Sequence, residues 1–464
     1  MHANPLAPTW LRPPADPNAL APGVWSATAT RDADGGLELG GMTAEAIVAE
    51  HGTPVYVVDE LDVRQRATET KAAFDAEIAR IGSSAKVYYA GKAFLSAEVV
   101  RWVAEAGLGV DVASHGELVV ALAGGIDPAR IGVHGNNKSD AQLSAAVAEG
   151  VGAIVIDAEW EIGRVAAFAA THGRVQGVRL RINSGVHAST HEYLATAHED
   201  QKFGVTLADA PRLVAAIRAE PSLAFLGLHS HIGSQIFDTE GFGEAARRLL
   251  RLHAQLLADG EVPELNLGGG FGIAYTSADA PLPIATIAAG IANALAAAAA
   301  ELGIPVPRIA VEPGRSIVGP STTTLYRVGT IKPVTVDTAG APATRTYVSV
   351  DGGMSDNLRT SLYRADYSAR IADRVSDAAP ILVRVAGMHC ESGDIVVRDE
   401  YLPGDVRPGD LLAVPATGAY GWAMSSNYNW VPRPPVVAVR DGRSRLLVRG
   451  ETVADLLARD ATLG

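Results

Sequence analysis

The feature that most constrains the fold of this chain is the alternation of short apolar segments with longer segments of helical spacing between residues 86 and 311. Strands that alternate with helices pair in parallel through crossover connections, and eight such units close into a (β/α)8 barrel. An open doubly wound sheet is the alternative fold for the same alternation. The pattern predicts eight barrel strands, at residues 86–90, 109–112, 131–134, 153–156, 178–182, 225–228, 264–267 and 309–311.

The pattern changes after about residue 320, where strand-like runs recur without long helices between them. Turn residues separate these runs, which indicates a mostly antiparallel β-barrel or β-sandwich domain. A chain of 464 residues is long enough for two domains, and we expect the amino-terminal arm to join the second one. The predicted barrel domain therefore spans residues 60–320, inserted between the two parts of the β domain at 1–59 and 321–464.

The charge balance and the cysteine content limit the partners and the compartment of the protein. The net charge of −13 argues against a surface for nucleic acid or for an anionic membrane. We find no apolar run long enough to span a bilayer, and no signal peptide at the start of the sequence. Cys390 is the only cysteine, so an internal disulfide is excluded and a reducing compartment is expected. Together these features indicate a cytoplasmic protein.

Polar residues and glycines gather at the ends of the predicted barrel strands. In a (β/α)8 barrel the carboxyl ends of the strands share one face, where active sites are built. Ordinary turn chemistry favours Gly, Asp and Asn at such ends, but it does not account for a lysine, a pair of histidines and a Glu-Pro-Gly-Arg run. We expect these strand ends to converge on one site: Lys92, Asp111, residues 134–138, Asp157, and residues 181–183, 229–231, 268–270 and 312–315.

Lys92 is the first candidate for chemistry. The β-branched and aromatic residues before it predict a buried strand, and Gly91 allows the backbone to turn where that strand ends. A lysine that is partly desolvated at such a position is a nucleophilic amine that can form a Schiff base. The alternative is a lysine that caps the strand with its ammonium group in solvent.

An aldehyde cofactor held by Lys92 as an imine would need a phosphate site, a partner for its ring nitrogen and a support for its ring. The glycine run at 268–270 and the hydroxyl group of Ser234 can donate to a phosphate. Glu312, at the end of the last predicted barrel strand, can pair with a protonated pyridine nitrogen. The imidazole of His231 can stack on the ring, although a lone histidine is more often structural.

These residues stand in motifs that resemble those of the fold-type III pyridoxal-phosphate decarboxylases, most of all those that act on meso-2,6-diaminopimelate. The resemblance extends from about Thr53 to near the end of the chain, and the motifs are specific as a set. It implies a barrel with a β domain, as in alanine racemase, and pyridoxal 5′-phosphate as the cofactor. The matching motifs are YYAGKA at 88–93, VDVAS at 110–114, GNNKS at 135–139, RIN at 181–183, KFG at 202–204, HSHIGSQ at 229–235, GGG at 268–270, EPGR at 312–315, RTSLY at 359–363, HCES at 389–392 and TGAY at 417–420.

The resemblance implies a role for each matching position. Lys92 corresponds to the internal-aldimine lysine, and Cys390 to the cysteine that donates a proton to the quinonoid carbanion. In this family the positions of Cys390 and Glu391 reach the active site of the partner subunit, so a homodimer with shared sites is implied. No metal ligands are implied. The implied cofactor-binding residues are Lys92, Asp111, His231, Ser234, Gly268, Gly269, Gly270, Glu312, Gly314, Arg315 and Tyr420, and the implied substrate-binding residues are Arg315, Arg359, Tyr363, Glu391 and Tyr420.

The expected substrate depends on three of these residues. Arg315 and Arg359 suit a substrate carboxylate, and Glu391 suits a distal ammonium group. Together they suit meso-diaminopimelate, whose decarboxylation gives L-lysine and CO2. The alternative on the same scaffold is an ornithine or arginine decarboxylase, which more often carries Cys-Asp at the positions of Cys390 and Glu391.

Two further interpretations share parts of this pattern. A racemase with the same two domains would need a tyrosine base and usually an arginine, in place of Glu312, at the ring nitrogen. A non-catalytic carrier of the cofactor would leave Cys390 and Glu391 unexplained. The sequence departs from the family at Ser184, where proline is common, and at Gln201, where serine is common. The long connection between these two residues is typical of a lid or binding loop.

Overall fold

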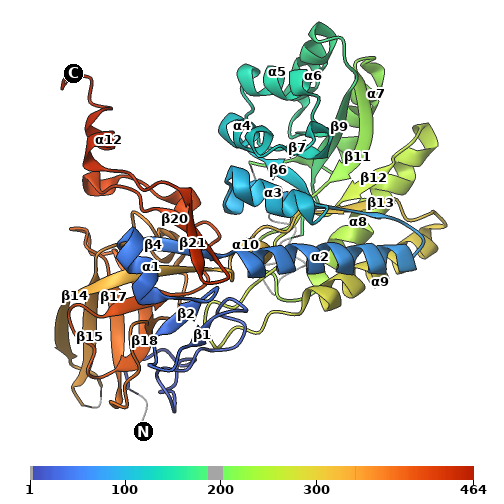
Figure 1. The fold of residues 1–464 in the computed structure, drawn as a ribbon. Coiled ribbons are helices and arrows are strands. Elements are labelled where there is room, and N and C mark those ends of the chain that lie inside the picture. The colour runs from blue at the N-terminus through green and yellow to red at the C-terminus, as the bar shows by residue number, and fades with distance from the viewer. Residues whose placement is uncertain (1–3, 187–201, 340, 464) are drawn as a thin grey trace. The chain divides into compact units, whose positions relative to one another are not determined.

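The computed structural model describes residues 4–186, 202–339 and 341–463, and the chain divides into two compact units (Figure 1). The barrel unit consists of Arg64–Gly272 and Pro281–Ser316. The β unit consists of Met1–Val63, Ile273–Ala280 and Ile317–Gly464. The short segment Ile273–Ala280 therefore belongs to the β unit, although barrel residues lie on both sides of it in the sequence.

Eight parallel strands of the barrel unit form a closed ring. The ring closes because β13 pairs with β5 and β8 pairs with β9, which confirms the predicted (β/α)8 barrel and excludes the open sheet. The strands are apolar and mostly buried, because side chains fill the barrel inside and helices cover it outside. The ring runs β5 (Ala85–Ala90), β6 (Gly109–Val112), β7 (Ile131–Val133), β8 (Ala153–Ile156), β9 (Gln176–Asn183), β11 (Leu223–His229), β12 (Glu264–Asn266) and β13 (Arg308–Val311), with the short β10 (Val205–Thr206) beside β9.

Several helices of the barrel unit begin at a serine cap. The hydroxyl groups of Ser96, Ser114 and Ser139 accept hydrogen bonds from backbone amides in the first turns of α3, α4 and α5. Such caps satisfy amide groups that the helix itself leaves without partners. The helices between Glu60 and Val318 are α2 (Glu60–Arg80), α3 (Ala97–Glu105), α4 (His115–Ala123), α5 (Asp140–Glu149), α6 (Glu159–Thr171), α7 (Ala210–Ala219), α8 (Glu240–Leu256), α9 (Ile284–Leu302) and α10 (Arg315–Val318).

Helix α9 corrects one expectation from the sequence. By length and composition alone this helix could cross a membrane, whereas we expected no apolar run of that length. In the barrel unit it packs against α8, and its residues Ile287, Ile291 and Leu295 are buried. Because a core helix of a folded domain passes the same test, α9 is only weak support for a membrane span.

A mostly antiparallel sheet forms the β unit. Its strand β4, from the amino-terminal arm, lies between β14 and β20, antiparallel to the first and parallel to the second. Strands β15 and β17 are also parallel. A hydrophobic core packs on this sheet and includes the fully buried side chains of Tyr326, Val348, Val383 and Leu412. The strands are β4 (Val55–Asp59), β14 (Thr322–Val336), β15 (Ala343–Val350), β16 (Arg370–Ile371), β17 (Pro380–Ala386), β18 (Ile395–Pro403), β19 (Leu411–Val414), β20 (Val436–Arg440) and β21 (Arg443–Val448), and the helices are α11 (Arg359–Tyr363) and α12 (Val453–Leu457).

The amino-terminal arm packs on the β unit ahead of β4. The side-chain amide of Asn4 donates a hydrogen bond of 2.8 Å to the carbonyl oxygen of Thr344. Leu11 is buried against Leu382 and Tyr401. The arm also contains the small sheet of β1 (Thr30–Arg31), β2 (Leu37–Leu39) and β3 (Met42–Thr43), followed by α1 (Ala44–His51).

Candidate active site

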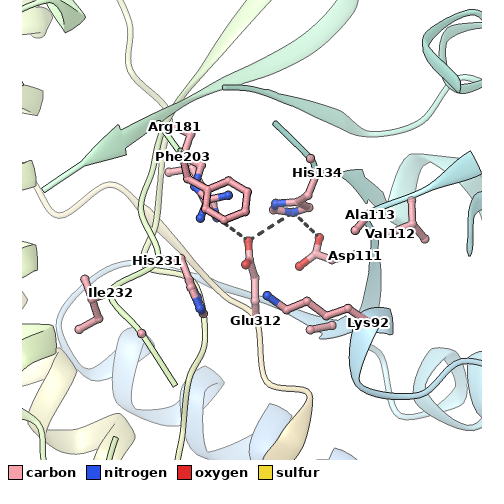
Figure 2. Close-up of a pocket in the computed structure, with 14 residues that line it drawn as sticks. Lys92, Asp111, Val112, Ala113, His134, Arg181, Phe203, His231, Ile232 and Glu312 are labelled. Atoms are coloured by element: carbon pink, nitrogen blue, oxygen red, sulfur yellow. Dashed lines mark ion pairs between the residues drawn. The ribbon is translucent and has the colours of Figure 1, made fainter. Parts of the chain in front are cut away.

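A cavity of about 360 Å3 opens at the carboxyl ends of the barrel strands, on the face where the sequence predicts a site (Figure 2). Residues at or near the ends of β5, β6, β7, β9, β11 and β13 contribute to its wall. Strand ends that lie far apart in the sequence therefore meet here, as a closed barrel requires. The lining residues are Ala90, Lys92, Asp111, Val112, Ala113, His134, Gly135, Arg181, Phe203, His229, His231, Ile232, Gly233 and Glu312.

Lys92 lies in the short 3-10 turn Gly91–Ala93, directly after β5, and lines this cavity. Its side chain is exposed, whereas the sequence led us to expect partial desolvation. Figure 2 shows its amino group directed toward Glu312. The turn requires Gly91, because a Cβ atom there would lie 2.8 Å from the carbonyl oxygen of Asp111. The fold therefore presents the amine of Lys92 to the cavity.

Glu312 follows β13 and is buried at the centre of a polar group. Its Oε1 atom lies 3.0 Å from His229 Nε2 and 3.5 Å from His134 Nε2. The same oxygen accepts a hydrogen bond of 2.7 Å from the side-chain amide of Asn266. Burial favours the neutral carboxyl group, but the imidazoles of His229 and His134 outweigh it and hold the pKa of Glu312 well below its usual range. Glu312 is therefore a buried anion, which suits a protonated ring nitrogen.

Asp111 is the second buried carboxyl group of the cavity. Its Oδ1 atom lies 3.1 Å from His134 Nε2. Burial and the neighbouring Glu312 carboxylate raise the pKa of Asp111 well above its usual range, and burial lowers the pKa of His134 to about 4. Of the two neighbouring carboxyl groups, Glu312 is therefore the stronger acid and carries the negative charge more readily than Asp111.

His231 is half-buried just after β11 and lines the same cavity. Burial and the ammonium group of Lys92 lower the pKa of His231 well below its usual range, so the imidazole is neutral. Its Nδ1 atom accepts a hydrogen bond of 3.3 Å from the backbone amide of Gly269. A neutral imidazole held at the cavity wall can support the face of an aromatic ring.

The glycine run after β12 packs backbone against backbone. A Cβ atom at Gly269 would lie 2.0 Å from the carbonyl oxygen of Glu312, and one at Gly270 would lie 2.3 Å from that of Gly233. Gly268 and Gly270 also have φ angles of +69° and +109°, which other residues rarely adopt. Only glycines allow the chain to pass this closely beside the end of β13.

Ser234 and Arg315 lie together in the barrel unit. Nη2 of Arg315 donates a hydrogen bond of 2.9 Å to Oγ of Ser234. Gly314, one residue earlier, packs on β5, where a Cβ atom would lie 2.9 Å from that of Ala90. These residues and the glycine run are not part of the cavity wall itself, but the amide of Gly269 joins that run to the lining residue His231.

Two predicted substrate residues lie on the short helix α11 of the β unit, and their environments differ. Arg359 is buried, with its guanidinium group 4.3 Å from the ring centre of Tyr275, and its Nη1 donates to the hydroxyl group of Tyr367 at 2.5 Å. Tyr363, at the other end of the helix, is 62% exposed. Arg359 is therefore not a solvated surface charge, and Tyr363 is open to a ligand or a partner.

Cys390 and Glu391 lie in the loop between β17 and β18, and both are exposed. Tyr420 lies in the segment after β19, is half-buried and has a φ angle of +61°. A tyrosine in this left-handed region is uncommon and is held there by its surroundings. Cys390, the predicted acid, and Glu391 therefore both lie on the surface of the β unit, whereas Tyr420 is partly enclosed.

Three residues contact Glu312: His134 and His229, which the sequence analysis expected at the site without assigning them a role, and Asn266, which it missed. His134, His229 and Asn266 each stand at or just after the end of a barrel strand. Their positions were the available signal, but polar residues at strand ends also serve turns. The ligand atoms of His134, His229 and Glu312 lie within 4.8 Å of one another, a spacing that could hold a metal ion, although no metal ligands were expected. The close contacts of the two imidazoles with the Glu312 carboxylate are sufficient to bring these atoms together.

The predicted lid between Ser184 and Gln201 lies for its greater part outside the described residues. Ser184 itself is buried at the start of this connection. Beyond its other end, Phe203 lines the cavity, and the guanidinium carbon of Arg181 lies 4.2 Å from the centre of the Phe203 ring. Arg181 was expected at the site from its strand end and Phe203 lies in a matching motif, but neither was given a role.

The groups around the cavity fit pyridoxal phosphate. An amine, a buried carboxylate and a neutral imidazole meet the demands of its aldehyde, its ring nitrogen and its ring face. Both carboxyl oxygens of Asp111 are buried without a hydrogen-bond donor of suitable geometry among the described residues. They are therefore free to accept a hydrogen bond from a bound ligand. The glycine run and the Arg315–Ser234 pair offer backbone and side-chain donors of the kind that bind phosphate.

Comparison with known proteins agrees with this site. Residues 61–319 match the family described as pyridoxal-dependent decarboxylase, pyridoxal binding domain. The diaminopimelate decarboxylase of Mycobacterium tuberculosis is 51% identical over 447 residues, which cover 95% of this chain and 98% of that protein. That of Bacillus subtilis is 43% identical, covering 93% of this chain and 97% of that protein. The crystal structure of the M. jannaschii diaminopimelate decarboxylase with L-lysine has a TM-score of 0.84 and 30% identity, covering 94% of this chain and 98% of that one. The chain therefore belongs to the pyridoxal-dependent decarboxylases and, within them, to the diaminopimelate decarboxylase family.

Proposed function

We propose that this enzyme decarboxylates meso-2,6-diaminopimelate to L-lysine and CO2. The observation that carries the proposal is the cavity in which the amine of Lys92 is directed toward the buried anion Glu312 (Figure 2). The 51% identity to a diaminopimelate decarboxylase over nearly the whole chain supports the choice of substrate.

The geometry of the barrel unit supports a proposed set of cofactor residues. Lys92 would hold the aldehyde carbon of pyridoxal phosphate, His231 the ring face, and Glu312 the ring nitrogen. The pKa of Asp111 is raised by burial and by the Glu312 carboxylate, so Glu312 is the better partner for a positive charge. The bound cofactor would supply the electron sink for the electron pair left at the α-carbon when the carboxylate departs as CO2. The phosphate group would lie among Ser234, Gly268, Gly269, Gly270, Gly314 and Arg315.

The substrate and proton-transfer residues come from both units. Arg315, Arg359 and Tyr363 would hold the substrate, with Tyr420 beside it and the cofactor. Glu391 would pair with the distal ammonium group, because a carboxylate is the natural partner of that charge. Cys390 would deliver the proton that replaces the carboxylate at the α-carbon, since a thiol can act as a general acid. The Cα–carboxylate bond breaks and one C–H bond forms, which balances diaminopimelate against lysine and CO2.

We further propose a cytoplasmic homodimer with shared active sites. Cys390 and Glu391 are exposed on their own chain, together with Tyr363, and exposure of this kind suits residues that serve the site of a partner subunit. The closed two-fold dimer is the commonest assembly for soluble proteins. The single cysteine suits a reducing compartment.

Release of CO2 by the purified enzyme with added pyridoxal phosphate tests the reaction and the substrate together. meso-Diaminopimelate, ornithine, arginine and lysine would be compared at equal concentration, with lysine measured as the product of the first. We expect release from diaminopimelate alone. Release from another amino acid would retain the reaction type and refute the substrate, whereas no release from any of them would refute the proposed activity.

A further inference from the structure

Backbone hydrogen bonds join the first residue of the loop that carries Cys390 and Glu391 to its last residue, Asp394. The backbone amide of Gly387 donates to the carbonyl oxygen of Asp394 at 2.9 Å, and the amide of Asp394 donates to that of Glu391 at 3.1 Å. The loop therefore begins and ends at the same place, between β17 and β18. What holds this closed loop against the rest of the β unit is the side chain of Asp394.

The carboxylate of Asp394 is buried and joins two segments of the chain. Its Oδ2 accepts a hydrogen bond of 2.7 Å from the backbone amide of His389, immediately before Cys390. Its Oδ1 accepts one of 2.6 Å from the backbone amide of Met354, in the segment that leads into α11. Hydrogen bonds to an ionised acceptor are about twice as strong as neutral ones. One side chain thus links the Cys390 loop to the helix that begins with Arg359.

The space around this carboxylate fits an aspartate closely. A Cβ atom at Gly387 would lie 2.2 Å from Oδ2, and one at Gly353 would lie 2.6 Å from Oδ1. Residues 353 and 387 must therefore be glycines, because any side chain there would collide with the carboxylate of Asp394. A second link supports the same contact, since the hydroxyl group of Ser361 on α11 donates to the carbonyl oxygen of Gly393 at 2.7 Å.

We propose that Asp394 is a positioning residue that fixes the loop of Cys390 and Glu391 on the β unit. The proposal rests on the proposed function, in which Cys390 supplies the proton and Glu391 pairs with the distal ammonium group at the site of the partner subunit. Asp394 itself is buried in its own chain and acts through the loop. It sets where the thiol is presented to that site, and a misplacement of about 1 Å can cost a catalyst on the order of 10²-fold in rate.

The test is Asp394→Asn, with Asp410→Asn as the matched control. Asparagine keeps the shape but turns its NH2 group toward one of the two backbone amides, so one hydrogen bond is lost. Asp410 is equally buried in the β unit, at 3% exposure for both residues, and accepts the amide of Arg407 at 3.0 Å without touching the Cys390 loop. We expect kcat to fall roughly 10- to 100-fold in Asp394→Asn, with a smaller change in KM and unchanged cofactor content.

A second measurement reads the position of the thiol without turnover. Because Cys390 is the only cysteine, iodoacetamide modification of the holoenzyme reports on it alone. We expect the rate and the pH profile of modification to change in Asp394→Asn and to stay as in the wild type in Asp410→Asn. If Asp394→Asn does not fold, Ser361→Ala should shift both readouts in the same direction by a smaller factor.

The outcomes separate this inference from the proposed function. The positioning role would be overturned if Asp394→Asn kept the wild-type kcat and the wild-type rate of thiol modification. If Asp394→Asn does not fold, the same result in Ser361→Ala would overturn it. Equal changes in Asp410→Asn would overturn it as well, because a general loss of stability would then explain them. A wild-type enzyme that releases no CO2 from diaminopimelate would refute the proposed function, while thiol modification would still decide whether Asp394 positions the loop.

Discussion

In the barrel unit Glu312 and Asp111 are buried beside the exposed Lys92, whereas in the β unit Tyr363, Cys390 and Glu391 all lie on the surface. The barrel supplies a buried carboxylate, neutral imidazoles and a glycine run that contact one another around a single cavity. The β unit supplies a short loop and a short helix joined by Asp394. A cofactor that stays bound needs the first arrangement, and a substrate that enters and leaves needs the second. We infer a division in which the barrel unit mainly holds the cofactor and the β unit mainly handles the substrate, with Arg315 and Tyr420 proposed to serve both.

Lys92→Ala tests the barrel side of this comparison and should have the largest effect. We expect CO2 release to fall by at least about 10³-fold, because the variant loses the amine that attaches the cofactor. Mass spectrometry after borohydride reduction should find the cofactor on the wild type and not on the variant. Lys86→Ala is the control, since Lys86 lies on β5, the strand that leads to Lys92, with its Nζ 2.5 Å from Glu264. Retained covalent cofactor in Lys92→Ala would refute the assignment.

Cys390→Ala tests the β-unit side and should leave the cofactor in place. We expect kcat to fall about 10²- to 10³-fold, as for removal of a general acid, with little change in cofactor content. Cys390→Ser serves as the conservative control, because it keeps a hydroxyl group that can donate a proton less readily. Loss of bound cofactor in Cys390→Ala would contradict the division between the units.

Mixing Lys92→Ala with Cys390→Ala subunits shows whether the Lys92 and the Cys390 of one active site come from different chains. If sites are shared, the mixed dimer contains one intact site. Activity should then return to roughly a quarter of the wild-type level in an equal mixture, from random pairing in a two-fold dimer. Recovery that is absent under conditions where subunits exchange would mean that each chain completes its own site.

Arg359→Lys should have a smaller and more selective effect. Lysine keeps the charge but lacks the planar fork of arginine, so we expect KM for diaminopimelate to rise about 10-fold, with less change in kcat. Alanine would be a poorer test, because Arg359 is buried between Tyr275 and Tyr367 and its removal would leave a cavity. Arg398→Lys, a more exposed position in the same unit, is the control. Equal losses for a monocarboxylate substrate would argue against a role in substrate choice.

The sequence predicted the barrel well because each strand is a short apolar run with polar residues at its end. Strand β6, for example, has the predicted bounds, and Lys92 follows β5 as expected. The strand-end pattern placed His134 and His229 at the site without indicating that they contact Glu312, and it missed Asn266, because an asparagine or a histidine at a strand end serves turns as readily as active sites. The contacts of Asp394 were also not predictable, because its role depends on Gly353 and Met354, which lie some forty residues away along the chain.

The environment of Arg359 shows a second limit of the sequence. Its guanidinium group packs on Tyr275, which belongs to Ile273–Ala280, a segment that the strand pattern places among the barrel residues. Periodicity identifies helices and strands, but it does not report when a loop leaves one unit to pack on the other. The sequence thus suggested a role for Arg359 without showing that tyrosines enclose it.

The pH dependence of stability should have opposite signs at His253 of the barrel unit and Asp356 of the β unit, and it should be the smallest effect. In the barrel unit, burial lowers the pKa of His253 from 6.5 to about 4. Its contribution to stability is complete above pH 6.5 and is lost as the pH falls through about 4. In the β unit, burial raises the pKa of Asp356 from 3.8 to about 7. That contribution is complete below pH 3.8 and is lost as the pH rises through about 7.

Calorimetry between pH 4 and 8 would measure both contributions. We expect His253→Gln to weaken the fall in Tm on the acid side, and Asp356→Asn to weaken the fall toward neutral pH, each by roughly 5 °C. The physical reason is that each substitution removes a group that the native fold holds neutral and the unfolded chain lets ionise. If both variants flatten the same side of the curve, buried ionisation does not separate the two units, and the contrast between them is limited to their candidate active-site residues.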